Sequence, residues 1–158
     1  MKIMILYYSK TGHTLEAVKA IADGINDVGS DADLVTVKEF NSGSIVDYDG
    51  LIVGSPCWAG STGILRGVPK VLSKLIESLD IDCLKGKRCG GISVHAKMGG
   101  TNTVRTLGKL LSLKGCDDYR PGPVARAGVP LSLWKGSSLS DKAKNIFKTF
   151  GAGFVNLN

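Results

Sequence analysis

Short apolar segments recur along the chain, and most lack the regular polar alternation of a half-exposed strand. Residues 2–8 (KIMILYY) and 48–54 (YDGLIVG) are the clearest, and short apolar runs of this kind are typical of strands buried on both faces. Residues 32–37 (ADLVTV) alternate, which predicts a strand nearer a sheet edge. Residues 88–94 predict a fourth strand, and a fifth is expected near residues 124–127.

Helical periodicity follows most of these strands. From Thr14 to near Gly29, apolar residues recur at three- and four-residue steps, as in an amphipathic helix. Further helices are predicted over residues 68–79 (with Pro69 in the first turn), 103–113 and 140–150 (with Ser140 as N-cap).

The connection between the second and third strands, residues 38–47, is shorter and more polar than an ordinary crossover helix. It can still hold one degenerate helical turn. Alternating strands and helices predict a three-layer α/β fold, with a parallel sheet covered by helices on both faces. The length of 158 residues suits one domain over residues 1–158.

Composition narrows the classes of partner. The formal net charge is +6, but Lys and Arg are spread along the sequence and no nucleic-acid motif accompanies them, so nucleic acid is disfavoured. A solvated basic surface and an acidic protein partner both stay open. Four cysteines without a CxxC pair argue against a metal centre. With no secretory leader and no apolar run near the roughly 20 residues of a membrane span, we expect a cytoplasmic protein with reduced thiols.

Right-handed crossovers place the loops that follow the strands along one rim of the sheet, where ligands bind in this class of fold. Three loops with unusual residues belong to that rim: 9–14, 55–63 and 95–101.

The first of these loops has the chemistry of a phosphate site. A helix N-terminus offers free N–H groups and the positive end of the helix dipole, and Gly12 lets the backbone approach closely. Ser9, Thr11 and Thr14 add hydroxyl groups, whereas Lys10 and His13 are expected to face solvent. A Walker loop is excluded because His13 follows Gly12, and no GxGxxG fingerprint is present in this turn.

The segment YYSKTGHT resembles the S/T-x-T-G-x-T phosphate loop of the flavodoxin-like family, which binds flavin mononucleotide (FMN). The resemblance extends over nearly the whole chain and implies the strand order 2-1-3-4-5. It also implies FMN as the cofactor, with its phosphate held by Ser9, Lys10, Thr11, Gly12, His13 and Thr14.

The same resemblance assigns the other two loops to the flavin ring and ribityl chain. In the second loop the aromatic Trp58 is expected to stack on the ring, and the Ala59–Gly60 peptide to flip on reduction. Cys57 is expected to be a packing residue. The complete second-loop prediction is Pro56, Cys57, Trp58, Ala59, Gly60 and Ser61.

The third loop departs from the long-studied flavodoxins, which usually present a tyrosine to the outer face of the ring. No Tyr, Trp or Phe lies between Ser93 and Thr103. His95 is interpreted as a hydrogen-bonding residue more readily than as a proton donor. The Gly99-Gly100 pair is similar to members that reduce quinones with a nicotinamide donor. The predicted contacts are Ser93, Val94, His95, Ala96, Met98, Gly99 and Gly100.

Three functions remain from these residues. The favoured one is an FMN-binding carrier that moves electrons between redox partner proteins, and the partner is expected to have an acidic docking surface. Arg66 and Lys97 near the ring then predict a less negative potential for the second electron than in acidic flavodoxins. The alternatives are an FMN-dependent NAD(P)H:quinone oxidoreductase and a flavin-free scaffold.

Other chemistries of the same layered fold are excluded. A receiver domain needs acidic residues where Tyr8 and Ser9 stand, and a phosphotyrosine phosphatase needs an arginine where Gly63 stands, six residues after Cys57. The sequence has no GxSxG elbow, no paired carboxylates that can be placed on the rim and no metal-spacing cluster, and no catalytic residue is predicted.

Overall fold

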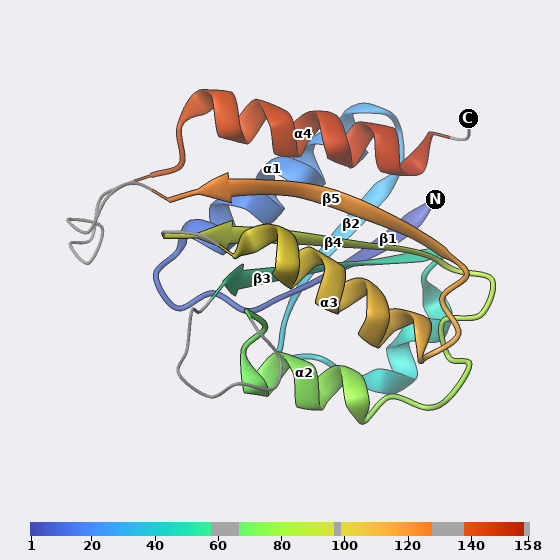
Figure 1. Ribbon diagram of the computed structural model, residues 1–158. Coiled ribbons are helices and arrows are strands. Elements are labelled where there is room, and N and C mark those ends of the chain that lie inside the picture. The colour runs from blue at the N-terminus through green and yellow to red at the C-terminus, as the bar shows by residue number, and fades with distance from the viewer. Residues whose placement is uncertain (58–66, 97–98, 128–137, 157–158) are drawn as a thin grey trace.

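The computed structural model describes residues 1–57, 67–96, 99–127 and 138–156 (Figure 1). Five parallel strands form one sheet in the order β2-β1-β3-β4-β5, as expected. The strands are β1 (Lys2–Tyr7), β2 (Asp31–Thr36), β3 (Gly50–Cys57), β4 (Arg88–His95) and β5 (Asp118–Arg126). The helices are α1 (His13–Asp27), α2 (Lys70–Glu77), α3 (Gly100–Ser112) and α4 (Asp141–Val155), with a 3-10 helix η1 (Ser42–Asp47) between β2 and β3.

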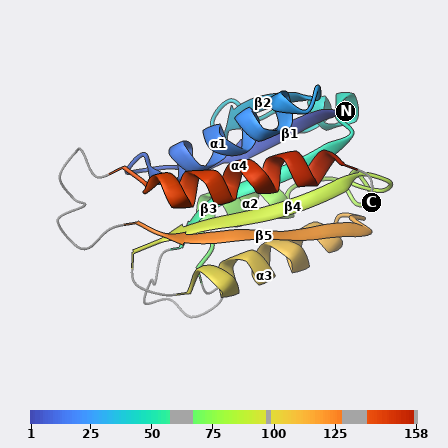
Figure 2. The same ribbon diagram turned by 90° about the horizontal axis from the view of Figure 1, so that it is seen from above.

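Helices cover both faces of the sheet, which confirms the three-layer architecture. Helices α1 and α4 lie on one face and α2 and α3 on the other, as Figures 1 and 2 show from two directions. No helix in the described ranges combines the length and the apolar character that a membrane span requires.

The two faces of the sheet form two apolar clusters. Successive side chains of a strand point to opposite faces, so Ile3 and Ile5 of β1 pack under α1 and α4, whereas Met4 and Leu6 pack against α2 and α3. All four are almost completely buried, and each contributes about 1.5–3 kcal/mol by leaving water. This explains why the interior positions of β1 are apolar on both faces.

The α1 and α4 backbones touch where the two helices cross. A Cβ atom built at Gly24 would overlap the carbonyl oxygen of Lys148, and one built at Gly151 would overlap that of Ile21. Glycines at both contact points therefore permit the close approach that seats α1, whose N-terminus forms part of the rim.

Several element boundaries differ from the sequence predictions. Strand β3 continues past Gly54 to Cys57, because these last residues pair with the end of β4. Helix α2 begins at Lys70, and Pro69 is its N-cap with an extended ψ of 138° instead of a first-turn residue. Helix α3 begins at Gly100, and α4 continues to Val155. The predicted N-cap is confirmed, since Ser140 accepts a hydrogen bond from the Ala143 N–H.

Strand β5 is an edge strand and begins six residues before the segment predicted for it. It contains Pro121 and Pro123, and its pairing with β4 shifts register between Gly91 and Ser93. Proline is found in sheets mainly at edges and bulges, which is how this irregular sequence can still be a strand.

Candidate functional site: the rim of β1, β3 and β4

The carboxyl ends of β1, β3 and β4 lie next to one another, so the three predicted loops start side by side. The Tyr8 N–H donates to the carbonyl of Gly54 at 3.1 Å, which ties the first loop to β3. Cys57 and His95 are register partners at the ends of β3 and β4. The strand order thus places the starts of all three loops on one edge of the sheet.

The first loop is held in shape by its own serine. The Oγ of Ser9 accepts hydrogen bonds from the N–H groups of Gly12 at 3.2 Å and of Leu15 at 3.3 Å. Gly12 is the N-cap of α1 and has a left-handed φ of 92°, with no described atom within 4 Å of the position of a Cβ. The turn therefore presents the start of α1 across an open backbone surface.

The prediction for His13 is wrong in one respect: its side chain is 7% exposed and does not face solvent. Its Nδ1 lies 2.9 Å from Thr11 Oγ1, within hydrogen-bonding distance, so the ring turns back into the loop. Thr14 is likewise buried, whereas Lys10 is exposed as expected. The His13 ring therefore stabilises the loop through its contact with Thr11.

The acidic residue in the first turn of α1 is directed toward α4. A Glu16 Oε atom accepts a hydrogen bond from the Leu139 N–H at 3.0 Å and lies 3.3 Å from the Lys144 ammonium group. These contacts partly neutralise a carboxylate that would otherwise oppose an anion at this helix N-terminus.

The thiol of Cys57 lies close to Gly99, before the start of α3, and to Gly67. A Cβ built at Gly99 would come within 2.9 Å of Cys57 Sγ, and one at Gly67 within 3.3 Å. This contact supports the interpretation of Cys57 as a packing residue. It also brings the start of α3 against the end of β3.

His95 is half-buried against the start of α3. A Cβ at Gly100 would lie 2.7 Å from His95 Cδ2. The His95 carbonyl accepts from the Ala127 N–H at 2.8 Å, and the Ala96 carbonyl accepts from Arg126 Nε at 3.1 Å. The end of β5 therefore anchors the backbone with which the third loop begins.

Ser93 and Val94 have different surroundings. Val94 is 4% exposed and belongs to the cluster under α1 and α4, so its side chain serves the core. Ser93 is completely buried, and its Oγ has no hydrogen-bond partner among the described residues. A buried hydroxyl in this state favours a polar partner supplied by a ligand or a neighbouring loop.

The remaining predicted ring contacts fall outside the described residues, as do the two cations expected near the ring. They are Trp58, Ala59, Gly60, Ser61 and Met98, together with Arg66 and Lys97.

Sequence reasoning missed two residues that position the third loop. Thr103 is buried, and its hydroxyl donates to the Gly99 carbonyl at 3.2 Å. Arg126 holds the Ala96 carbonyl, as above. Neither residue belongs to a recognisable sequence motif. The position of Arg126 at the end of a predicted strand, and therefore at the same rim, could have indicated its role.

Among the described rim residues, Tyr7 has a shifted pKa. Burial, and then the negative charge of Glu39, raise the pKa of Tyr7 above its usual value. This phenol at the end of β1 is therefore neutral at physiological pH. No group of residues suited to a metal ion occurs in the described ranges.

The sequence model of the family described as Flavodoxin matches residues 5–118, which is more than half of the chain. The chain belongs to the flavodoxin family. FMN is the cofactor of this family. The match begins in β1 and ends at the start of β5, so it includes all three rim loops.

Solved flavodoxins share the fold. Oxidised Flavodoxin 1 from Bacillus cereus superposes with a TM-score of 0.74 at 18% identity, with 100% of both chains covered. Two-electron reduced Megasphaera elsdenii flavodoxin gives a TM-score of 0.75 at 19% identity, covering 96% of this chain and 97% of that one. A WrbA-like flavodoxin from Agrobacterium tumefaciens gives 0.64 at 20% identity, covering 97% and 94%.

One curated relative is similar in sequence. The NAD(P)H dehydrogenase (quinone) of Rhodopseudomonas palustris (strain BisB5) is 26% identical over 126 residues, which cover 65% of this chain. The flavodoxin-family chain spans only about 55% of that relative's length.

The described residues fit the family cofactor at its phosphate end. The Ser9-held turn, the open surface at Gly12 and the N-terminus of α1 suit a phosphate group. The buried Ser93 hydroxyl near the end of β4, which has no hydrogen-bond partner among the described residues, is a second polar group close to the rim.

Proposed function

We propose that this flavodoxin-family chain is an electron carrier that binds FMN without a covalent bond and exchanges electrons with redox partner proteins. The observation that carries the proposal is the Ser9–Gly12 turn at the N-terminus of α1. When bound, FMN supplies the redox chemistry, because its ring can accept and release electrons. The chain's own residues bind it, orient it and limit its contact with water.

The phosphate is assigned to residues 9–14. Ser9 fixes the turn, and Gly12 leaves room for the phosphate beside the backbone. Thr11 and Thr14 offer hydroxyl groups, and the N-terminus of α1 adds its dipole. Lys10 is exposed, so the site relies mainly on uncharged donors.

The ring and ribityl chain are assigned to the second and third loops. Gly99 and Gly100 allow the start of α3 to lie against Cys57 and His95, at the ends of β3 and β4. Trp58 is proposed as the flat side chain that excludes water from one ring face. The full set is the one predicted above: Pro56–Ser61, Ser93–Ala96 and Met98–Gly100.

Titration of apoprotein with FMN and, in parallel, with riboflavin tests the assignment. Riboflavin lacks only the phosphate, so the ratio of the two dissociation constants isolates the first loop. Several charge-assisted hydrogen bonds, at about 1.5–3 kcal/mol each, predict at least about 100-fold tighter binding of FMN. Quenching of flavin fluorescence measures both constants. Equal affinities would remove the phosphate assignment, and no binding of either flavin would remove the redox function.

A second candidate, NAD(P)H:quinone oxidoreductase, is favoured by the quinone dehydrogenase relative and by the absence of an aromatic residue between Ser93 and Thr103. An uncovered outer ring face would give a nicotinamide room to approach. Steady-state oxidation of NADPH or NADH with benzoquinone separates the two functions, with free FMN at equal concentration as the background. A carrier should show almost no turnover above that background.

A further inference from the structure

The charges of the chain are distributed unevenly across the sheet. Residues 1–57 hold eight acidic and four basic residues, whereas residues 58–158 hold six acidic and sixteen basic ones. Residues 83–116 include seven Lys or Arg and no Asp or Glu. Because the strand order is β2-β1-β3-β4-β5, the three strands of the acidic part form the β2 side of the sheet, and β4 and β5 of the basic part form the other side.

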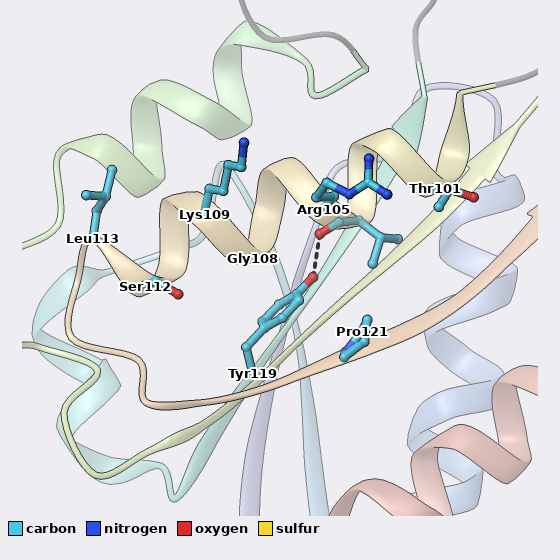
Figure 3. Close-up of a pocket in the computed structure, with 9 residues that line it drawn as sticks. Thr101, Arg105, Gly108, Lys109, Ser112, Leu113, Tyr119 and Pro121 are labelled. Carbon is cyan, nitrogen blue, oxygen red and sulfur yellow. Dashed lines mark hydrogen bonds between the residues drawn. The ribbon is translucent and has the colours of Figure 1, made fainter.

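A groove lies on the basic side, between α3 and β5, with a cavity volume of about 790 Å³ (Figure 3). Its apolar lining comes from Val104 and Leu113 of the α3 segment and from Tyr119 and Pro121 of β5. Leu113 is 72% exposed and Pro121 is also exposed. Apolar side chains at an open surface of this kind favour contact with another molecule.

The floor of the groove is fixed by Tyr119. Its hydroxyl donates to the Val104 carbonyl at 2.5 Å, shown as the dashed line in Figure 3. The ring can lie against α3 because position 108 is glycine: a Cβ there would come within 2.6 Å of the ring. Burial raises the pKa of Tyr119, so the phenol stays uncharged. The groove is therefore preformed, which lowers the entropic cost of binding.

Two cations flank this apolar surface. Arg105 and Lys109 lie one turn apart on α3, both are exposed, and neither forms an ion pair with a carboxylate in the described parts of the chain. Asp118, at the start of β5, is already engaged by Arg88 at 2.8 Å and Arg120 at 2.9 Å. The lining of the groove includes no acidic residue.

We propose that the α3–β5 groove is the docking site for an acidic redox partner protein. Carboxylates of the partner pair with Arg105 and Lys109, while an apolar partner side chain lies over Tyr119 between Leu113 and Pro121. The groove reaches Thr101, directly after the Gly99–Gly100 pair of the third loop, so a partner bound here lies beside the proposed ring site. This inference deepens the proposed function, on which it rests for the partner's redox role.

Charge complementarity selects this occupant. An acidic partner meets two cations that form no ion pair in the described ranges, Arg105 having only a hydrogen bond to the Asn102 side chain, whereas a second copy docked groove to groove would place like charges together. A protein also suits the open form of the groove, since Thr101, Arg105, Ser112 and Leu113 are all exposed.

Fluorescence anisotropy with a labelled amphipathic helical peptide of Glu and Leu tests the proposal, with a peptide of Gln and Leu as the ligand control. Arg105→Glu/Lys109→Glu should weaken Glu-peptide binding at least about tenfold, because two attractions become repulsions. The matched control is Lys19→Glu/Lys38→Glu, which makes the same charge change at two exposed lysines without ion pairs in the described ranges. That control should bind within about twofold of the parent protein, and Leu113→Gln should weaken binding without changing charge.

Three results would overturn the docking site. They are the absence of Glu-peptide binding by both the parent protein and the control, an equal loss of affinity in the two double variants, and binding of the Gln peptide as tight as that of the Glu peptide. Sedimentation showing a dimer that Arg105→Glu/Lys109→Glu alters would identify a second copy as the occupant instead. The assay reads binding without flavin, so its failure is distinct from a failure to bind FMN, which is measured separately on the same variants.

Discussion

Gly12 has two roles: it lies in the proposed phosphate site, and it adopts a backbone conformation that favours glycine. Its φ of 92° is one that a side chain with a Cβ adopts at a cost of about 1–2 kcal/mol. Gly12→Ala should therefore lower stability by about that amount and also weaken FMN binding about tenfold, because the new methyl group occupies space beside the phosphate.

Gly29 provides the matched control for Gly12. It follows the other end of α1 with φ of 76°, and it too has open space around the position of a Cβ. Gly29→Ala should show a similar loss of stability with unchanged FMN affinity. Chemical denaturation and FMN fluorescence quenching separate the two effects. An equal loss of FMN affinity in both variants would show that backbone strain, and not contact with the phosphate, explains the effect of Gly12→Ala.

Asp118 gives a pH-dependent prediction. Hydrogen bonds from Arg120 and Arg88 lower the pKa of its carboxyl below the usual 3.8. The stabilisation is therefore present above pH 3.8 and is lost as the pH falls through the lower folded-state pKa. Asp118→Asn should reduce stability at pH 7 by about 1 kcal/mol, after allowance for screening of this half-exposed group.

The difference in stability between the parent protein and Asp118→Asn should narrow as the pH falls below 3.8. Urea denaturation of both proteins across a pH series measures it. Asp31→Asn is the control, since Asp31 is exposed and forms no ion pair in the described ranges. A constant difference down to acidic pH would assign the effect to something other than the carboxylate charge.

For individual residues, the sequence indicated the chemistry of the first loop but not the direction in which each side chain points. The spacing of Ser9, Thr11, Gly12 and Thr14 predicted the turn, because glycine and hydroxyl groups have local roles there. The burial of His13 depends on a bond to Thr11 and on packing that no local pattern encodes.

At the scale of elements, the crossing of α1 and α4 depends on close backbone contact. Gly151→Ala should destabilise the protein by about 1–3 kcal/mol or more, because the new Cβ overlaps the Ile21 carbonyl and the helices must separate. Gly153→Ala, two residues along the same helix, meets no described atom within 4 Å and should stabilise it by up to about 1 kcal/mol. Thermal and urea denaturation of both variants give the comparison. Equal effects would show that backbone contact does not limit this crossing.

The order and type of the elements could be predicted because buried strands and amphipathic helices have distinct periodicities. Their ends could not. The last residues of β3 are a Ser-Pro-Cys sequence that resembles a loop, and only pairing with β4 makes them a strand. The start of β5 could not be predicted either, because its prolines argue against a strand unless that strand lies at the edge of the sheet.

At the scale of the whole molecule, the positive charge has a consequence for redox behaviour. A positive field stabilises the added negative charge of reduced flavin, which makes the potential for the second electron less negative. Salt screens that field, so this potential should become more negative as ionic strength rises. Potentiometric titration of the FMN-loaded protein over a salt series, with free FMN as the reference, measures the effect. A shift of the opposite sign would contradict it.

Strand β5 ends the sheet with two residues, Pro121 and Pro123, that have no N–H to offer an incoming strand, and with a register shift beside them. Extension of the sheet by a neighbouring chain is therefore disfavoured at this edge. Recognition at this edge then depends mainly on side chains, and crowded copies of the protein are hindered from pairing edge to edge into fibrils.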